Sequence, residues 1–212
     1  MKKYGIPTAR YETFDSPDKV KFFTKENEPV VVKASGLAAG KGVILCSDGV
    51  EAWSAVQSIM LKQSFGNAGD QVVVEEFLTG QEVSLLAFTD GKTVLPLDSA
   101  QDHKAAFDGD KGPNTGGMGA YSPTPVFTEE LKQQALDEIM IPTVRAMAKE
   151  GRYYRGILYA GLMLTESGPK VLEFNARFGD PETQPILMRI KNDIVPIFEA
   201  CIDGTLSTKT LQ

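Results

Sequence analysis

The alternation of apolar and polar residues along the chain predicts short strands joined in hairpins. One hairpin is expected over residues 82–97, where two apolar runs flank Asp90-Gly91, a dipeptide that favours a tight turn. A second is expected over residues 155–175, where two strongly apolar strands meet at Ser167-Gly168. Further strands are predicted over residues 29–33, 43–46 and 71–78.

Helices are predicted from capping residues and from apolar positions at helical spacing. Ser16 and Pro17 suit the N-cap and the first position of one helix. A long helix is expected from residue 128 to about residue 150, and Pro142 should kink or divide it. In a helix expected over residues 49–62, the apolar face consists of Val50, Trp53, Val56, Ile59 and Met60.

The order of these elements indicates the α+β class. Two more helices, beginning near Pro181 and near Asp193, are expected to close the chain. Helices and hairpins mix without regular βαβ alternation, which argues against a doubly wound parallel sheet. Between the first hairpin and the long helix lies an irregular stretch of about residues 98–127, and loops of that length are usually functional or disordered.

Composition and charge are those of an ordinary globular protein. The 212 residues are 42% hydrophobic and 24% charged, with a net charge of −6, so neither nucleic acid nor an anionic membrane is expected as partner. No apolar run is long enough to cross a bilayer. Cys46 and Cys201 have no metal-binding spacing and His103 is the single histidine, which favours a reduced cytoplasmic protein over a zinc protein.

A glycine-rich loop over residues 34–42 is the first candidate site. It is not a P-loop, because only three residues separate Gly36 from Gly40 and Gly42 follows Lys41 where Ser or Thr belongs. Its glycines would let backbone N–H groups approach an anion. A hairpin tip with a solvated Lys41 explains the loop equally well. Lys33 is more telling, because a lysine that ends a Val-Val-Val run costs desolvation unless it meets an anion.

Two polar segments follow in the middle of the chain. The first segment consists of Glu75, Glu76, Phe77 and Leu78, followed by Glu82. Its backbone could bind an adenine edge, and a carboxylate could bind ribose hydroxyls. On spacing alone, however, a charged connection between subdomains is favoured. The stretch 101–121 concentrates donors suited to a phosphate or carboxylate, and a disordered surface loop is the alternative. Its candidate substrate-binding residues are Asp102, His103, Lys104, Asn114, Thr115, Gly116, Gly117 and Met118.

The stretch KVLEFNARFGDPETQ, residues 170–184, is the strongest candidate. Strand alternation places Glu173 and Asn175 on one face together with Val171, with Leu172 and Phe174 on the core side. A carboxylate and an amide oxygen suit Mg²⁺, which keeps waters and leans on substrate phosphates.

The residues after that strand extend the candidate site. Arg177 can fork onto a phosphate oxygen. Asp180, Pro181 and Glu182 are expected to be the N-cap, first position and acidic first turn of a helix whose N-terminus faces the anion. The alternative is that Asp180 only caps a helix and Glu173 pairs with a lysine.

Together, these motifs resemble the ATP-grasp superfamily. More narrowly, KASGLAAGKGV, AQDHK, GPNTGGMGAY and LEFNARFGDPETQ resemble the phosphoribosylamine–glycine ligases, also called glycinamide ribonucleotide synthetases, through nearly the whole chain. The resemblance implies an ATP-grasp fold of two α+β subdomains, 1–78 and 79–212, with ATP bound between them. It also implies further N- and C-terminal domains in the full-length ligase. Ala105 stands where the family carries arginine, which changes the substrate contacts that the resemblance implies there.

The resemblance implies a reaction and a set of roles. Glycine and 5-phosphoribosylamine would be joined with ATP and Mg²⁺ (or Mn²⁺) through a glycyl phosphate. The alternatives are an isolated ATP-binding fragment without full activity and an ATP-grasp ligase for another carboxylate. The implied nucleotide-binding residues are Lys33, Gly40, Lys41, Gly42, Glu75, Glu76, Phe77, Leu78 and Glu82; the metal ligands are Glu173 and Asn175; and the catalytic residues are Arg177, Lys41 and Asp180.

Overall fold

The chain folds into two compact units. The computed structural model describes residues 1–20, 28–36, 42–103, 105–109, 111–115 and 117–212, of which residue 105 and residues 111–114 are described by their backbone alone. Residues 9–78 form the smaller unit, and residues 1–8 with 79–212 form the larger one. Each unit has its own hydrophobic core.

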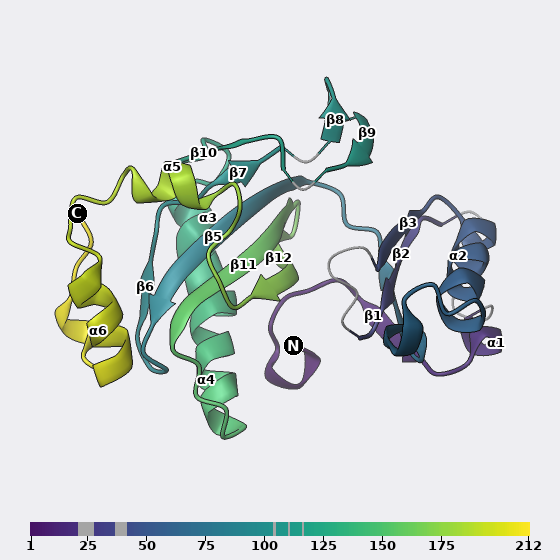
Figure 1. Cartoon of the computed structure of the whole chain (residues 1–212), viewed down its shortest axis with the longest axis horizontal. Coiled ribbons are helices and arrows are strands. Elements are labelled where there is room, and N and C mark those ends of the chain that lie inside the picture. Colours follow the sequence, from purple (N-terminus) through teal and green to yellow (C-terminus); the bar gives the residue numbers. More distant parts are fainter. Residues whose placement is uncertain (21–27, 37–41, 104, 110, 116) are drawn as a thin grey trace. The chain divides into compact units, whose positions relative to one another are not determined.

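The smaller unit is a four-stranded antiparallel sheet with helices packed against it (Figure 1). The strand order is β1-β4-β2-β3, and Val32, Val72 and Val74 are fully buried in its core. The strands are β1 (Tyr11–Phe14), β2 (Val30–Ala34), β3 (Val43–Cys46) and β4 (Val72–Glu76). The helices are α1 (Pro17–Val20), α2 (Gly49–Val56), which continues as the wider turn η2 (Gln57–Leu61), and η3 (Gly66–Gly69).

The buried face of helix α2 agrees only in part with the one that the sequence predicted. Asp48 caps the helix by accepting hydrogen bonds from the backbone N–H groups of Val50 and Glu51. That start turns Val50 outward, where it is 72% exposed. The buried face combines the predicted Val56 and Ile59 with Ala52 and Ala55, and the predicted Met60 packs against the same core. The small alanines allow the helix to lie close to the valine-rich sheet.

The larger unit is built on a second four-stranded antiparallel sheet, of order β12-β11-β5-β6. Both predicted hairpins are present in it, as β5–β6 and β11–β12. The stretch 98–127, expected to be irregular, contains two small sheets, β10-β7 and β8-β9. The strands are β5 (Gln81–Thr89), β6 (Val94–Pro96), β7 (Gln101–Asp102), β8 (Ala105–Phe107), β9 (Lys111–Asn114), β10 (Ala120–Tyr121), β11 (Gly156–Thr165) and β12 (Gly168–Asn175).

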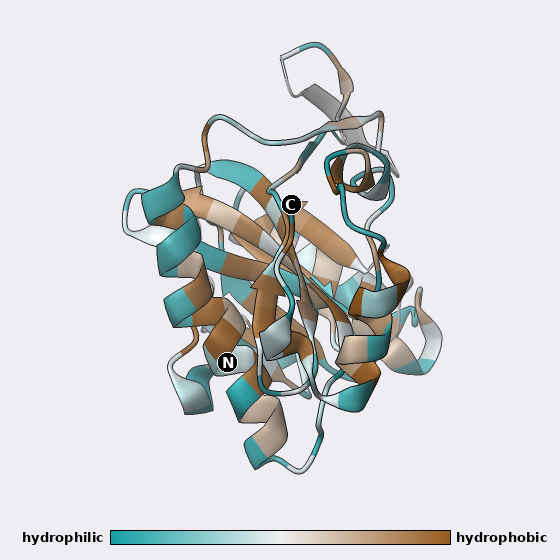
Figure 2. Cartoon of the chain, turned by 90° about the vertical axis from the view of Figure 1, so that its left-hand side faces the viewer, coloured by the Kyte–Doolittle hydropathy of each residue, from teal (hydrophilic) through white to brown (hydrophobic). Residues whose placement is uncertain are grey.

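Helices cover both faces of this sheet. One core cluster joins Val83, Leu85 and Ala87 to the long helix, and the other joins Leu86 and Phe88 to the C-terminal helices. Apolar colour is accordingly concentrated on the strands (Figure 2). The helices are α3 (Glu129–Ala135), η4 (Leu136–Met140), α4 (Ile141–Lys149), α5 (Thr183–Leu187), α6 (Val195–Asp203), and the short turns η1 (Lys2–Tyr4) and η5 (Leu206–Thr208).

The expected interruption at Pro142 takes the form of one wide turn. Thr128 caps the helix, and η4 closes with a bond from the backbone N–H of Ile141 to the carbonyl of Leu136. Proline lacks an N–H and crowds the preceding turn, so a locally wider helix accommodates it. Among the described residues, no helix combines the length and apolar character needed to cross a membrane.

Residues 1–8 belong to the larger unit, whereas the sequence placed them in the smaller one. The backbone N–H of Val171 donates to the carbonyl of Pro7 at 2.9 Å, and the Thr8 hydroxyl donates to the carbonyl of Val171 at 2.8 Å. Ile6 is buried in the same core cluster as Val171. These bonds extend the β12 edge of the sheet, which local sequence patterns do not reveal.

Asp90, at the β5–β6 turn, should contribute strongly to the stability of the larger unit. It is 4% exposed, and its carboxylate accepts backbone N–H bonds from Lys92, Thr93 and Leu206 at 3.0, 2.7 and 3.2 Å. Asp90→Asn removes the charge from these bonds and places an amide N–H₂ against donors, so it should lower the free energy of unfolding by about 1–3 kcal/mol. Urea unfolding at pH 7 measures the loss, and the exposed Asp203→Asn is the control.

The effect of Asp90→Asn should depend on pH. Burial raises the pKa of Asp90, but its bonds to the backbone of Thr93, Lys92 and Leu206 outweigh burial and hold that pKa below its usual value. A carboxyl with a lowered folded-state pKa stabilises the fold above its unfolded-state pKa, and that stabilisation is lost as pH falls through the folded-state pKa. The wild-type advantage should therefore shrink below about pH 4. A difference that stays constant down to pH 2 would contradict this role.

Candidate functional site

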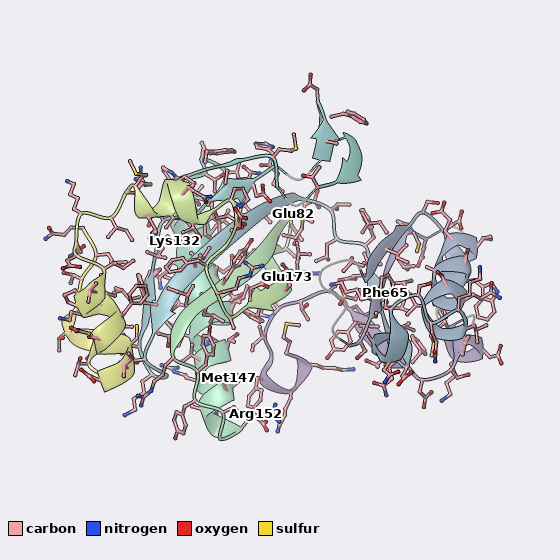
Figure 3. All side chains as sticks on the ribbon, in the orientation of Figure 1. Phe65, Glu82, Lys132, Met147, Arg152 and Glu173 are labelled. Atoms are coloured by element: carbon pink, nitrogen blue, oxygen red, sulfur yellow. The ribbon has the colours of Figure 1, made fainter. Side chains whose placement is uncertain are left out.

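Glu173 and Asn175 lie side by side near the end of β12, and we call them the acid–amide pair. The Asn175 side-chain N–H₂ donates to Glu173 Oε1 at 2.9 Å. On the neighbouring strand β11, Gly161 lies opposite Glu173 and Tyr159 lies opposite Asn175. A Cβ at Gly161 would come within 3.3 Å of Glu173 Cγ, so the glycine leaves room for the glutamate to lie over the strand. Figure 3 labels Glu173 on β12 and Glu82 at the start of β5.

The predicted face of Val171 was wrong, because β12 contains a bulge. Gly161 pairs with Glu173, but the next residue, Leu162, pairs with Val171, so Leu172 is the extra residue. The bulge breaks the period of two. Val171 and Phe174 therefore pack in the same core cluster, while Glu173 is exposed.

Arg177 follows the acid–amide pair and lies over an aromatic ring. Its guanidinium carbon is 5.9 Å from the centroid of the Tyr159 ring, within the range of a cation–π contact. Its Nη1 donates to the carbonyl of Phe178 at 2.9 Å. The residue is exposed, so the guanidinium combines an aromatic support with access to an anion.

The helix expected to begin at Asp180 begins later. Helix α5 starts at Thr183, Glu182 occupies the N-cap position without a side-chain capping bond, and the Asp180-Pro181 peptide is cis. Asp180 and Pro181 lie in the preceding turn. Glu182 is 2% exposed and accepts a hydrogen bond from Ser84 Oγ at 3.0 Å and another from the Tyr159 hydroxyl. Tertiary partners thus hold this carboxylate in the core, and the predicted acidic first turn was wrong.

Two of the substrate-binding candidates, His103 and Met118, lie next to the β7–β10 pair. The backbone N–H of His103 donates to the carbonyl of Gly119 at 3.0 Å, and that of Met118 donates to the carbonyl of His103 at 2.7 Å. The His103 and Tyr121 rings stack with centroids 5.8 Å apart. Thr115 Oγ1 accepts the backbone N–H of Gly117 at 3.1 Å.

Gly117 links this stretch to the turn before α5. Its φ is +118°, and a Cβ there would lie 2.6 Å from Pro181 Cδ and 3.1 Å from Asp102 Oδ1. The absence of a side chain therefore lets the Asp102 and Pro181 segments approach each other. Two of the predicted segments, far apart in sequence, are neighbours within the larger unit.

Several predicted residues lie outside the described residues. They are Gly40, Lys41, Lys104 and Gly116, together with the side chain of Asn114.

In the smaller unit, Lys33 meets an anion supplied by the chain itself. Its Nζ is 2.7 Å from Glu75 Oε2, and the two side chains are 22% and 16% exposed. Val31 is opposite Glu75 in the β2–β4 ladder, so Lys33 and Glu75 are diagonal neighbours on one face. Glu75 therefore provides the anion that the partly buried Lys33 needs, without a phosphate.

The other described residues predicted to bind nucleotide lie in the ends of strands or next to them. Glu76 Oε1 accepts the backbone N–H of Arg10 at 3.1 Å, and the Gly42 carbonyl accepts the backbone N–H of Ala34 at 2.8 Å. Phe77 is 39% exposed. Leu78 ends the smaller unit, while Glu82 lies in β5 of the larger one.

Sequence reasoning missed Ser84, Tyr159 and Gly161, which lie on the same face of the sheet as the acid–amide pair. Gly161 is opposite Ser84 as well as Glu173, and Tyr159 is opposite Asn175. The signal was present as a single serine inside the apolar run VSLLAF and a tyrosine followed by a glycine in ILYAGLML.

The acid–amide pair fits a magnesium-type ion better than a metal held by protein alone. Throughout the described ranges, no group of three or more His, Cys, Asp or Glu residues could hold a metal ion. A carboxylate and an amide are hard oxygen donors, and two of them are enough for an ion that keeps waters and binds substrate phosphates.

Gly179→Ala should destabilise the larger unit. A Cβ at Gly179 would lie 2.3 Å from Glu182 Oε2 and 2.9 Å from Tyr159 Cε1, and both neighbours are buried. Since the φ of Gly179 is not positive, the cost comes from space alone and should be about 1–3 kcal/mol in urea unfolding. Gly161→Ala is the matched control, because its neighbour at 3.3 Å belongs to an exposed glutamate that can move. Equal costs for the two variants would contradict this packing.

Comparisons with known proteins agree on one family. The model of the family "Phosphoribosylglycinamide synthetase, ATP-grasp (A) domain" matches residues 1–183. A phosphoribosylamine–glycine ligase of Halalkalibacterium halodurans is 56% identical over 205 residues, covering 96% of this chain and 48% of the relative. One of Neisseria meningitidis serogroup A is 50% identical over 214 residues, covering 100% of this chain and 51% of the relative.

One solved structure supports the same assignment, and a more distant one shares the fold. The crystal structure of a phosphoribosylamine–glycine ligase from Thermotoga maritima is 37% identical with a TM-score of 0.87, covering 96% of this chain and 52% of that one. The biotin carboxylase domain of a Hydrogenobacter thermophilus 2-oxoglutarate carboxylase, solved with MgADP and bicarbonate, shares the fold at 19% identity with a TM-score of 0.70, covering 96% and 43%. The chain spans about half the length of the curated relatives it matches. The fold is ATP-grasp, and the chain belongs to the phosphoribosylglycinamide synthetase ATP-grasp (A) domain family.

Proposed function

We propose that this chain forms the ATP-grasp part of a phosphoribosylamine–glycine ligase, which joins glycine to 5-phosphoribosylamine with ATP. The products would be glycinamide ribonucleotide, ADP and phosphate, a step of purine biosynthesis. The observation that carries the proposal is the acid–amide pair on β12 together with the Arg177 guanidinium over the ring of Tyr159, which lies opposite Asn175, in a chain of this family. That arrangement offers a metal site and a cation for a phosphoryl group.

The acid–amide pair would hold Mg²⁺ or Mn²⁺ against the nucleotide's phosphates. The ion, when bound, neutralises charge on the β- and γ-phosphates. Asn175 uses its N–H₂ toward Glu173, so its carbonyl oxygen is the atom suited to a cation. The exposed guanidinium of Arg177 would donate to an oxygen of the transferring phosphoryl group. Asp180 of the adjacent turn remains a catalytic candidate.

The reaction needs no protein nucleophile. A glycine carboxylate oxygen attacks the γ-phosphorus, the bond from phosphorus to the bridging oxygen breaks, and ADP leaves with the electron pair. The amine of 5-phosphoribosylamine then attacks the acyl carbon of glycyl phosphate, phosphate leaves, and the amine gives up a proton. The protein's part is positioning and electrostatic stabilisation. The residues proposed to border glycine and the ribose phosphate are Asp102, His103, Lys104, Asn114, Thr115, Gly116, Gly117 and Met118.

The nucleotide assignments are proposed for each unit separately. In the smaller unit, the phosphates would be contacted by Lys33, Gly40, Lys41 and Gly42. The adenine would be contacted by residues 75–78. In the larger unit, Glu82 would contact the ribose. The Lys33 ammonium has three N–H donors, so its pairing with Glu75 is compatible with a second bond to a phosphate.

A cytoplasmic location is proposed with this metabolic role. Both cysteines are buried and free, and burial, followed by the nearby carboxylates of Glu51 and Asp48, raises the pKa of Cys46 to about 11. The thiol is therefore protonated at neutral pH, as suits a reduced structural cysteine.

The test is ADP release that depends on both glycine and 5-phosphoribosylamine. The chain would be assayed alone and joined to the flanking segments of the Halalkalibacterium halodurans relative, because it spans about half that relative's length. Activity only in the longer protein would assign the chain as an ATP-binding part of the ligase. Activity with other carboxylates but not glycine would overturn the proposed substrate. Calorimetric titration with Mg²⁺ and ATP, followed by glycine, separates nucleotide binding from substrate binding.

Glu173→Gln should sharply reduce Mg²⁺-dependent ATP turnover. The substitution keeps the shape of the side chain but removes the charge of the proposed metal ligand, so turnover should fall on the order of 100-fold or more. Turnover is measured against Mg²⁺ concentration, and Glu166→Gln on the exposed β11–β12 turn is the matched control. Unchanged turnover and Mg²⁺ dependence would remove the metal assignment.

A further inference from the structure

Three polar side chains are buried next to the candidate site, and we call Ser84, Tyr159 and Glu182 the buried triad. They come from β5, from β11 and from the turn before α5. Ser84 Oγ lies 2.8 Å from the Tyr159 hydroxyl and 3.0 Å from Glu182 Oε1, and the Tyr159 hydroxyl donates to the same carboxylate oxygen. Their exposures are 5%, 5% and 2%. The triad therefore fastens the turn before α5 to the middle of the sheet.

Stability alone does not explain a carboxylate in this place. Glu182 Oε2 is buried and has no hydrogen-bond partner among the residues that the structure describes. It is packed against Gly179, where a Cβ would approach it to 2.3 Å, so no ligand reaches this oxygen. A buried carboxylate with an unsatisfied oxygen costs free energy that an apolar side chain of similar size would not. We therefore expect Glu182 to fix the positions of neighbouring side chains rather than to add stability.

The geometry that the triad controls is that of the Tyr159 ring. Its hydroxyl donates to Glu182 and lies 2.8 Å from Ser84 Oγ, and burial, together with the bond to Glu182, raises the pKa of Tyr159 well above its usual range. The ring lies opposite Asn175 in the ladder and supports the Arg177 guanidinium at 5.9 Å. An arginine side chain has several free torsions, so a fixed ring beneath it restricts where its charge can lie.

We propose that Tyr159 is a positioning residue which, fastened by Glu182 and Ser84, sets the Arg177 guanidinium beside the acid–amide pair. The chemical purpose of this placement rests on the proposed function, but the placement itself does not. Glu182 fixes the position of the Tyr159 ring, and that ring in turn restricts the position of the Arg177 guanidinium. Because a misplacement of about 1 Å in a reacting group can cost about 100-fold in rate, a rigid support of this kind has a measurable effect.

The first test measures the Arg177 side chain directly, without substrates. In the ¹⁵N-labelled chain, the Arg177 Nε–Hε resonance is assigned by its loss in Arg177→Lys, and its heteronuclear NOE reports side-chain order. Tyr159→Phe and Glu182→Gln should each lower the NOE and move the resonance toward that of an exposed arginine. Tyr154→Phe is the matched control, because the Tyr154 hydroxyl also donates a hydrogen bond, which is partly buried, to the carbonyl of Ile157, outside the triad. An Arg177 signal unchanged in both triad variants, with the fold intact, would overturn the proposal.

The second test is a double-mutant cycle in the glycine-dependent ADP release assay. Tyr159→Phe should lower kcat by about 10- to 100-fold while the KM for ATP stays within about twofold. In an Arg177→Lys background the same substitution should cause little further loss, because the residue through which it acts is already changed. Independent, multiplicative losses would overturn the positioning role. If glycine-dependent ADP release is absent both from the wild-type chain and from the wild-type chain joined to the flanking segments, the proposed function fails, and the NMR measurement alone decides the positioning role.

Discussion

The pairing of β11 with both of its neighbours determines which side chains share the candidate site. Tyr159 stands opposite Leu86 on one side and Asn175 on the other, and Gly161 stands opposite Ser84 and Glu173. A shift of one residue in either ladder would turn the polar side chains to the opposite face, where the long helix packs. One register therefore places the acid–amide pair, the Tyr159 ring and Ser84 on the same face.

The bulge at Leu172 reconciles this register with the needs of the core. A regular β12 would place Val171 on the same face as Glu173 and Asn175, beside polar groups. The extra residue lets the strand bury Val171, which is 1% exposed, before it presents the two polar residues on the other face. Bulges are common beside functional sites because they redirect side chains without breaking the sheet. Here the bulge allows one strand to bury Val171 in the core and to present Glu173 and Asn175 on the opposite face near its end.

The hairpins were predicted correctly from the sequence, whereas the mutual arrangement of the candidate-site segments was not. Strong apolar runs and the Asp90-Gly91 and Ser167-Gly168 turns are local signals, and both hairpins are present. A period of two cannot reveal an inserted residue, so the face of Val171 was predicted wrongly. The cap assigned to Asp180 failed for another reason, because Ser84 and Tyr159 draw Glu182 into the core. Tertiary partners decided these positions, and no pattern within the segment contains them.

Lys33 illustrates how far an argument from burial extends. A lysine after three valines does need an anion, and Glu75 on the adjacent strand provides one at 2.7 Å. Both side chains are partly buried, and the attraction between the two charges offsets the free energy that each loses when it is removed from water. Burial therefore predicts that Lys33 has a partner, but it does not distinguish a carboxylate of the chain from a phosphate of a ligand. Since an ammonium group carries three donors, a phosphate could join Glu75 without displacing it. The ion pair with Glu75 by itself therefore accounts for the position of the lysine.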